Sequence, residues 1–140
     1  MSKTYSTVID IKAAPDRVMT ILRDVERWPE WTSTMTSIRR LDTGPFRVGS
    51  RAKVQQPKLK PAVWRVTELD DKHFTWIANG PGIRMTARHD VERTDAGSRV
   101  TLSLEFSGLL TWLAVRVAGE LTQRYIAIEA EGLQKRSLTP

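Results

Sequence analysis

The side chains best suited to proton chemistry in this sequence are one histidine and one tyrosine. His89 alternates along a predicted strand with apolar neighbours on the same side, which are Met85, Ala87 and Val91. An imidazole there could exchange a proton or a hydrogen bond with a bound molecule near neutral pH, or it could be a core histidine bonded to a backbone group. Tyr125 falls on the apolar stripe of a predicted helix. Its hydroxyl would anchor a ligand, or it would be a packing residue that reaches the rim.

Other catalytic sets are missing. The chain has no cysteine, which excludes disulfides, thiolate metal ligands and cysteine nucleophiles. No zinc-hydrolase, serine-hydrolase or phosphate-loop spacing occurs, so we expect neither a metal nor a nucleotide cofactor. The carboxylates of Asp70-Asp71 lie in a turn, those of Glu129 and Glu131 near a helix end, and that of Glu120 off the inward stripe. We therefore expect no carboxyl group desolvated for acid/base work. His73 begins a strand beside the charged turn and is expected at the surface.

Length and charge narrow the class of protein. A chain of 140 residues suits one domain, predicted over residues 1–140, and the net charge of +6 comes from basic residues spread along the chain. No basic run alternates with stacking aromatics, which favours a solvated surface over nucleic-acid binding. The start lacks the apolar core of a signal peptide. The longest apolar stretch, Leu109–Ala118, is well short of the ~20 residues of a membrane span. A cytoplasmic protein without integral membrane association is predicted.

Periodicity predicts the elements that position these residues. A strand over residues 3–12 leads into a helix that Pro15 opens and that Trp28-Pro29 interrupts. Further strands are predicted over residues 34–41, 50–56, 62–67, 73–78, 83–92 and 99–106. Clean alternation with tight turns, as at Asn79–Gly82, is typical of an antiparallel sheet with one buried face.

A long helix is predicted over residues 109–136. Its apolar stripe consists of Leu110, Ala114, Val117, Leu121, Tyr125 and Ile128. At 1.5 Å per residue such a helix spans about 40 Å, and only the inner face of the sheet offers it enough apolar surface. Small inward residues such as Ala52 and Ala87 indicate either a close approach of helix and sheet or a space left unfilled.

Aromatic residues supply the walls of any such space. Trp31, Trp64, Trp76 and Trp112 would surround a ring-containing ligand or simply fill the core. Trp112 and its neighbours make the start of the long helix apolar nearly all round. That segment could cover a pocket entrance, meet a second subunit, touch a membrane surface, or be buried under the loop around Trp31.

An ordered set of short motifs resembles one known superfamily. The segment Asp24-Val25-Glu26-Arg27-Trp28-Pro29-Glu30-Trp31 is similar to the D-x-x-x-W-P-x-W signature of the START-like (SRPBCC), polyketide cyclase/dehydrase superfamily. Proteins of this superfamily also have a strand that leads into the first helix, a central hairpin and a closing element before the last helix. The segments similar to these are, in the same order, Ile9–Pro15, Phe74-Thr75-Trp76 and Gly108-Leu109-Leu110. The resemblance implies an α+β helix-grip fold. In such a fold a strongly curved antiparallel sheet wraps a long C-terminal helix, two short helices follow the first strand, and a hydrophobic cavity is common.

We therefore expect non-catalytic binding of a hydrophobic or amphipathic small molecule, such as a lipid, a polyketide or an isoprenoid-like compound. The expected ligand contacts are Trp31, Trp64, Trp76, Met85, His89, Phe106, Trp112, Val117, Leu121 and Tyr125. One alternative is a metal-free cyclase/dehydratase-like enzyme that uses His89 and Tyr125 for proton transfer. Another is a regulatory or stress-type protein-interaction module, and the apolar helix start leaves a homodimer open.

Overall fold

The computed structural model describes residues 1–140 and contains seven strands and three helical segments. In chain order these are β1 (Ser2–Ile11), α1 (Pro15–Arg23), the 3-10 helix η1 (Val25–Glu30), β2 (Ser37–Arg40), β3 (Arg51–Gln55), β4 (Ala62–Leu69), β5 (His73–Gly80), β6 (Ile83–Thr94), β7 (Gly97–Ser107) and α2 (Thr111–Leu138). All neighbouring strands pair antiparallel, in the order β1-β7-β6-β5-β4-β3-β2. The predicted fold class is confirmed, although the strand expected over residues 34–41 is shorter than its pattern indicated.

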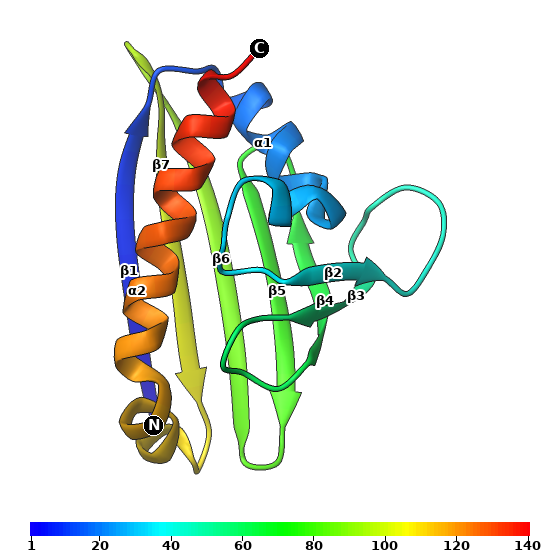
Figure 1. Cartoon of the computed structure of the whole chain (residues 1–140), viewed down its shortest axis with the longest axis vertical. Helices are drawn as coiled ribbons and strands as arrows, with labels where there is room; N and C mark the ends of the chain where they lie inside the picture. The colour runs from blue at the N-terminus through cyan, green and yellow to red at the C-terminus, as the bar shows by residue number, and fades with distance from the viewer.

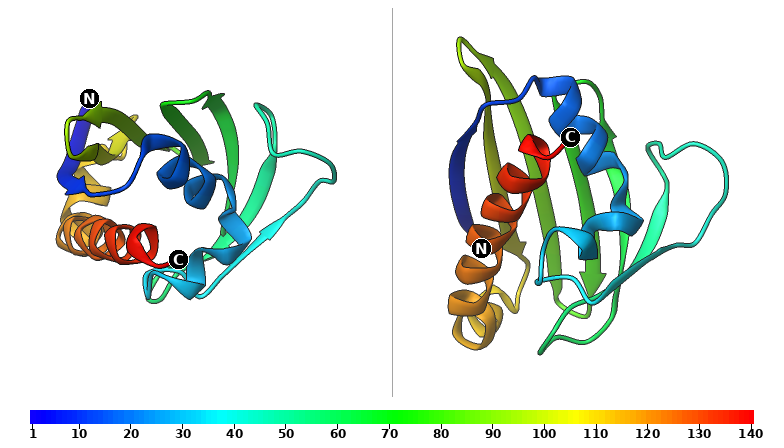
Figure 2. Two further views of the ribbon diagram at one scale, coloured as in Figure 1. Left: turned by 90° about the horizontal axis from the view of Figure 1, so that it is seen from above. Right: turned by 45° about the horizontal axis from the view of Figure 1, so that its top comes forward.

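The sheet curls into a trough, and the helices lie on its concave side (Figures 1 and 2). The long helix α2 packs mainly against β1 and β7, at one edge of the sheet, and against α1. A bulge in the β4–β5 ladder between Val66 and Glu68 adds twist to the half of the sheet that lies away from α2. Because α2 leans toward one edge, the middle strands do not meet it directly.

Trp28 forms the centre of the core between η1 and the sheet. Its side chain is fully buried, and its Nε1 donates a hydrogen bond of 3.1 Å to the carbonyl oxygen of Leu22. The centroid of its ring lies 5.4 to 6.2 Å from those of Trp31, Phe74, Trp76 and His89. The tryptophan that begins the W-P-x-W motif therefore fastens the short helices to β5 and β6.

The inward stripe predicted for α2 is wrong in its orientation. Val117 is 75% exposed and Ile128 is also exposed, whereas the buried residues of α2 are Thr111, Gly119, Thr122, Ile126, Glu129, Ala130, Leu133 and Ser137. The helix approaches β1 so closely at Gly119 that a Cβ there would collide with the hydroxyl of Tyr5. Close approach demands small residues on the inner face, so apolar periodicity alone selects the wrong side.

Candidate functional site

A cavity of about 120 Å³ lies between α2 and the concave face of the sheet, and 14 of its 20 lining residues are hydrophobic. Aromatic walls come from Trp28, Trp64, Trp76 and Phe106. An apolar cavity of about 150 Å³ accommodates benzene, so this one is close to the size of a single ring. Of the two interpretations of the small inward residues, Ala87 supports the unfilled space because it lines the cavity.

The cavity brings together six of the ten residues expected to contact a ligand: Trp64, Trp76, Met85, His89, Phe106 and Tyr125. Their contact with a ligand stays a prediction. Four others lie outside the lining. Trp31 packs on Trp28 and under α2, where a Cβ on Gly132 would collide with its carbonyl oxygen. Trp112 and Val117 point into solvent, and Leu121 is half-buried but does not line the cavity.

The structure excludes one of the four interpretations left open for the helix start around Trp112. Its side chain is 55% exposed, so it is not buried beneath the loop around Trp31. It does not border the cavity either. The start of α2 is therefore an exposed apolar segment.

His89 is buried, and one of its ring nitrogens is already bonded. Its Nδ1 lies 2.8 Å from the carbonyl oxygen of Phe74, which requires Nδ1–H to donate and assigns the proton to that nitrogen. The ring stacks on that of Phe74 at 4.8 Å. Burial lowers the pKa of His89 to about 4, despite the opposing effect of the backbone hydrogen bond. At neutral pH the imidazole is uncharged, and Nε2, which bonds no protein group, is left as an acceptor.

Tyr125 connects α2 to the β3–β4 loop. Its hydroxyl donates a hydrogen bond to the carbonyl oxygen of Pro57. Gln56 and Leu59, on either side of that proline, line the cavity together with Tyr125. Because the hydroxyl proton is already donated to Pro57, Tyr125 holds α2 against the β3–β4 loop at the wall of the cavity.

Glu129 is the polar residue that sequence reasoning missed. The residue is only 9% exposed and lines the cavity. Burial raises the pKa of its carboxyl group to about 7, and a hydrogen bond of 3.0 Å from the Thr34 hydroxyl to Oε1 opposes the shift only in part. The expectation that no carboxyl group would be desolvated is wrong. The available signal was the spacing of Glu129 from Thr122, Ile126 and Leu133, which together form the buried face of α2.

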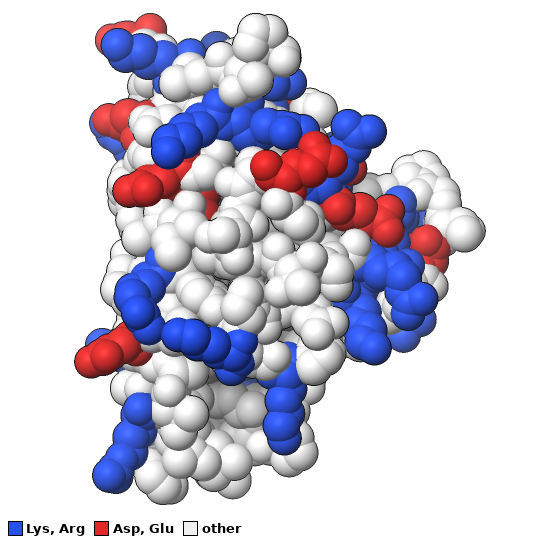
Figure 3. Space-filling view, in the orientation of Figure 1, with Lys and Arg blue, Asp and Glu red and all other residues white.

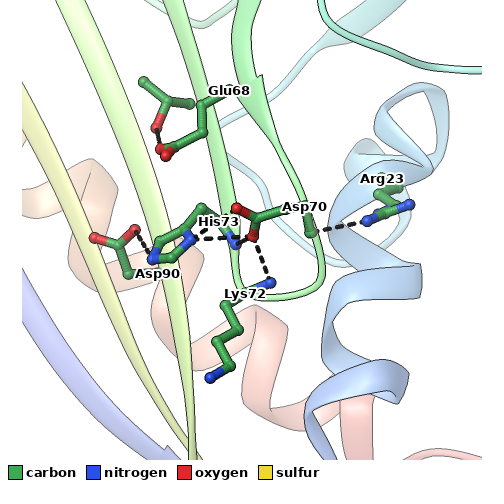
Figure 4. A network of polar contacts seen from close by, with 7 residues as sticks. Arg23, Glu68, Asp70, Lys72, His73 and Asp90 are labelled. Atoms are coloured by element: carbon green, nitrogen blue, oxygen red, sulfur yellow. Dashed lines mark hydrogen bonds and ion pairs between the residues drawn. The ribbon is translucent and has the colours of Figure 1, made fainter.

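A second polar cluster lies at the β4–β5 turn, on the surface (Figure 4). Ligand atoms of Glu68, Asp70 and His73 lie within 4.8 Å of one another, a spacing that could hold a cation. Asp70 Oδ1, however, already accepts hydrogen bonds from the backbone N–H groups of Lys72 and His73, and it lies 3.0 Å from His73 Nδ1. The backbone oxygen of Asp70 also accepts a hydrogen bond from Arg23 of α1. The cluster thus shapes the turn and attaches it to α1.

The fold and the cavity agree with the comparison to known proteins. Residues 2–137 match the family model described as "Polyketide cyclase / dehydrase and lipid transport", and the chain belongs to this family. No curated protein sequence matches it. None of its helices combines the length and apolar character needed to cross a bilayer.

Several solved structures share the fold at low sequence identity. The protein TTHA0849 from Thermus thermophilus superposes with a TM-score of 0.77 at 19% identity, over 97% of both chains. The Zhui aromatase/cyclase from Streptomyces gives 0.80 at 13% identity, over 98% of this chain and 94% of the other. Norcoclaurine synthase from Thalictrum flavum, in complex with dopamine and hydroxybenzaldehyde, gives 0.76 at 14%, over 99% and 87%. These likenesses concern the fold.

Proposed function

We propose that the protein binds a small, uncharged, ring-containing molecule in the cavity between α2 and the sheet. The observation that carries the proposal is an internal space of about 120 Å³ with four aromatic walls. An aromatic ligand would gain both apolar burial and ring–ring contacts there. The family description, which names polyketide chemistry and lipid transport, fits a ligand of this class.

Two polar groups in the cavity would select the ligand. Nε2 of His89 is an acceptor, so it favours a ligand that carries a hydrogen-bond donor such as a phenolic hydroxyl. The carboxyl group of Glu129, with its pKa near 7, can donate when protonated and accept when ionised. Anionic ligands are disfavoured, because Arg88, the cation in the lining, is already paired with Glu105 and does little to compensate the loss of their hydration.

The volume also limits the length of the ligand. One ring or one short branched segment fits, so a polyketide, isoprenoid or lipid would place only part of itself inside. We propose that the remainder passes between Tyr125 and Leu59, which both line the cavity and lie where α2 meets the β3–β4 loop. Lengthening the hydrogen bond between Tyr125 and Pro57 would widen that passage.

Calorimetric titration with phenol, and with benzoate as a matched anion, tests the proposal. We expect phenol to bind with one site per chain and benzoate to bind at least about tenfold more weakly, because burying an unpaired carboxylate is unfavourable. The binding of 2-naphthol measures whether the cavity accepts a second ring. Failure of both phenol and 2-naphthol to bind, with the protein folded, would contradict the proposal.

A second candidate function is proton transfer to a bound ligand, and the buried carboxyl group of Glu129 favours it. A general acid or base is most effective when its pKa lies near the working pH, and that of Glu129 is raised to about 7. This revises the pair expected from the sequence, since the hydroxyl of Tyr125 is committed to Pro57 and His89 is uncharged. We assign proton transfer to Glu129 and acceptance of a ligand hydrogen bond to His89.

Deuterium exchange separates this candidate from simple binding. Phenylacetone carries one ring and acidic protons beside its carbonyl group, and NMR in D₂O measures their exchange. We expect the protein to accelerate the exchange and Glu129→Gln to abolish the acceleration while phenol still binds. If phenylacetone exchanges no faster with the protein than in buffer alone, the proton-transfer function is contradicted and only ligand binding remains.

A further inference from the structure

We propose that the end of the molecule where α2 begins is a docking surface for an anionic membrane. Six exposed apolar residues gather there and form what we call the α2-start patch: Met1, Leu109, Leu110, Trp112, Leu113 and Val117. Leu109 is 86% exposed. None of these side chains lines the cavity, and only Leu110 packs against the body of the protein, on Gly82.

The patch covers one outward face of the helix. Leu113 and Val117 are four residues apart, so they lie one above the other on α2. The opposite face carries Thr111 and Gly119, which are buried against the body of the protein. A solvated helix of this kind would present polar residues outward. Apolar residues gathered on an exposed face are typical of an interaction surface.

Backbone contacts hold the patch in place. The backbone N–H of Leu110 donates to the carbonyl oxygen of Gly82 at 2.9 Å, and that of Gly108 donates to Met1 at 3.2 Å. Gly108 has φ +111°, and a Cβ there would lie 2.7 Å from the Gly82 oxygen, so only glycine permits this approach. The N-terminus, the β5–β6 turn and the start of α2 are thereby joined. Docking would not require this backbone to become ordered first.

The charges around the patch are mostly positive. The segments 1–9, 79–89 and 106–119, which lead to or from this end, contain Lys3, Arg84, Arg88 and Arg116 and no Asp or Glu, whereas the exposed Glu120 follows on α2 three residues after Val117. In Figure 3 the acidic residues gather mainly in the upper half of the view. The lower part, where α2 begins in Figure 1, is largely uncharged surface with scattered Lys and Arg and one acidic group at its left edge. Arg88 is paired with Glu105 at 3.1 Å, whereas Lys3, Arg84, Arg116 and the α-amino group form no ion pair, although Arg84 Nε donates to Asn79 and Lys3 lies over the ring of Tyr5.

An anionic bilayer complements both properties of this surface. Trp112 and the leucines suit the boundary between headgroups and acyl chains, and Arg84 and Arg116 suit lipid phosphates. A two-fold dimer through the same patch would bring together two surfaces of net positive charge. A nucleic acid would leave the apolar side chains in water. The combination therefore favours a lipid surface.

Docking at this end would also orient the cavity. Met85, Phe106 and Ala118 line the cavity and belong to the same segments as the patch. A bilayer at the patch would therefore lie next to one end of the cavity wall. The docking proposal stands independently of the ligand, since it rests on the exposed surface alone.

Vesicle co-sedimentation tests the proposal with the full chain. The probes are vesicles of phosphatidylcholine with about 30 mol% phosphatidylserine, and vesicles of phosphatidylcholine alone. We expect binding to the anionic vesicles that weakens as salt rises, and much weaker binding to the neutral ones. Leu113→Ser with Val117→Ser should weaken binding about tenfold or more, because two inserted apolar side chains are lost.

Matched variants control for surface changes elsewhere. Val8→Ser with Val63→Ser removes two exposed apolar side chains from β1 and β4 and should bind as the wild type does. Arg84→Gln with Arg116→Gln should weaken binding to the anionic vesicles and reduce its salt dependence. Circular dichroism confirms that each variant is folded.

Three results would overturn the proposal. The first is no co-sedimentation of the wild type with anionic vesicles. The second is equal loss of binding in the patch variant and in its Val8/Val63 control. The third is a dimer, seen by size-exclusion chromatography, that Leu113→Ser with Val117→Ser dissociates while vesicles are not bound. This last result would assign the α2-start patch to self-association.

Discussion

Glu129 and His89 line the same cavity, and burial shifts their pKa values in opposite directions, to about 7 and to about 4. Both side chains are therefore mostly uncharged between roughly pH 4.5 and pH 6.5. A neutral cavity can hold a neutral ligand without burying a charge. Above pH 7 the carboxylate forms, and below pH 4 the imidazolium forms.

The two shifts predict opposing pH dependences of stability. The pKa of Glu129 is raised in the folded state. Its contribution to the free energy of unfolding is therefore fully present below about pH 4.5 and is lost as pH rises to about 7. The pKa of His89 is lowered, so its contribution is complete above about pH 6.5 and falls as pH drops to about 4. Each slope is about 1.4 kcal/mol per pH unit, and between pH 4.5 and 6.5 the two largely cancel.

Glu129→Gln removes the pH dependence of stability that the buried carboxyl group causes and leaves the one that His89 causes. Relative to the wild type, the variant should gain about 3 kcal/mol of unfolding free energy between pH 4.5 and pH 7.5. Urea unfolding at a series of pH values measures the difference, in which groups common to both proteins cancel. For His89→Asn, the unfolding free energy relative to the wild type should instead fall as pH rises from about 4 to about 6.5. A pH-independent difference for both variants would show that neither group is buried in its neutral form.

Filling the cavity should block the ligand without changing the fold. Ala118→Leu places three additional carbons in a space of about 120 Å³, so the affinity for phenol should fall about tenfold or more. Ala114→Leu is the matched control, since it is one turn earlier on α2, half-buried, and outside the cavity lining. Calorimetry measures both, and equal affinities for phenol would place the binding site elsewhere.

Trp28 should be far more important for stability than Trp112. Trp28 is fully buried among aromatic rings, so Trp28→Ala should lower the unfolding free energy by about 3–5 kcal/mol. Trp112 is mostly exposed, and Trp112→Ala should change it by less than about 0.5 kcal/mol. Urea denaturation compares them. A large loss in Trp112→Ala would mean that the start of α2 is covered in solution.

Tyr125→Phe should loosen the passage into the cavity. The variant keeps the ring but loses the hydrogen bond to Pro57, so the loop over residues 56–61 should open more often. Amide hydrogen exchange of that loop should become faster. Phenol should associate and dissociate faster, while its affinity changes little. Unchanged exchange would indicate that the loop is held by other contacts, such as that of Gln56 with Thr34.

Local sequence features determined the elements and their order. Alternation from Ile83 to Val91 indicates a strand with His89 on its inner side, because successive side chains point to opposite faces. Turn residues such as Asn79–Gly82 and Thr94–Gly97 mark where the strands reverse. The spacing around Trp28 and Trp31 indicated the family, which the match over residues 2–137 confirms.

Only the tertiary structure decided which face of α2 points inward. Apolar periodicity selected the side with Val117 and Ile128, but close packing at Gly119 requires the side with small and polar residues. That rotation buries Glu129 and raises its pKa, and it exposes Leu113 and Val117. Burial depends on how the helix sits in the trough, a relationship between segments far apart in the chain. A local pattern does not contain it, so the burial of Glu129 and the exposure of the α2-start patch were decided by the fold.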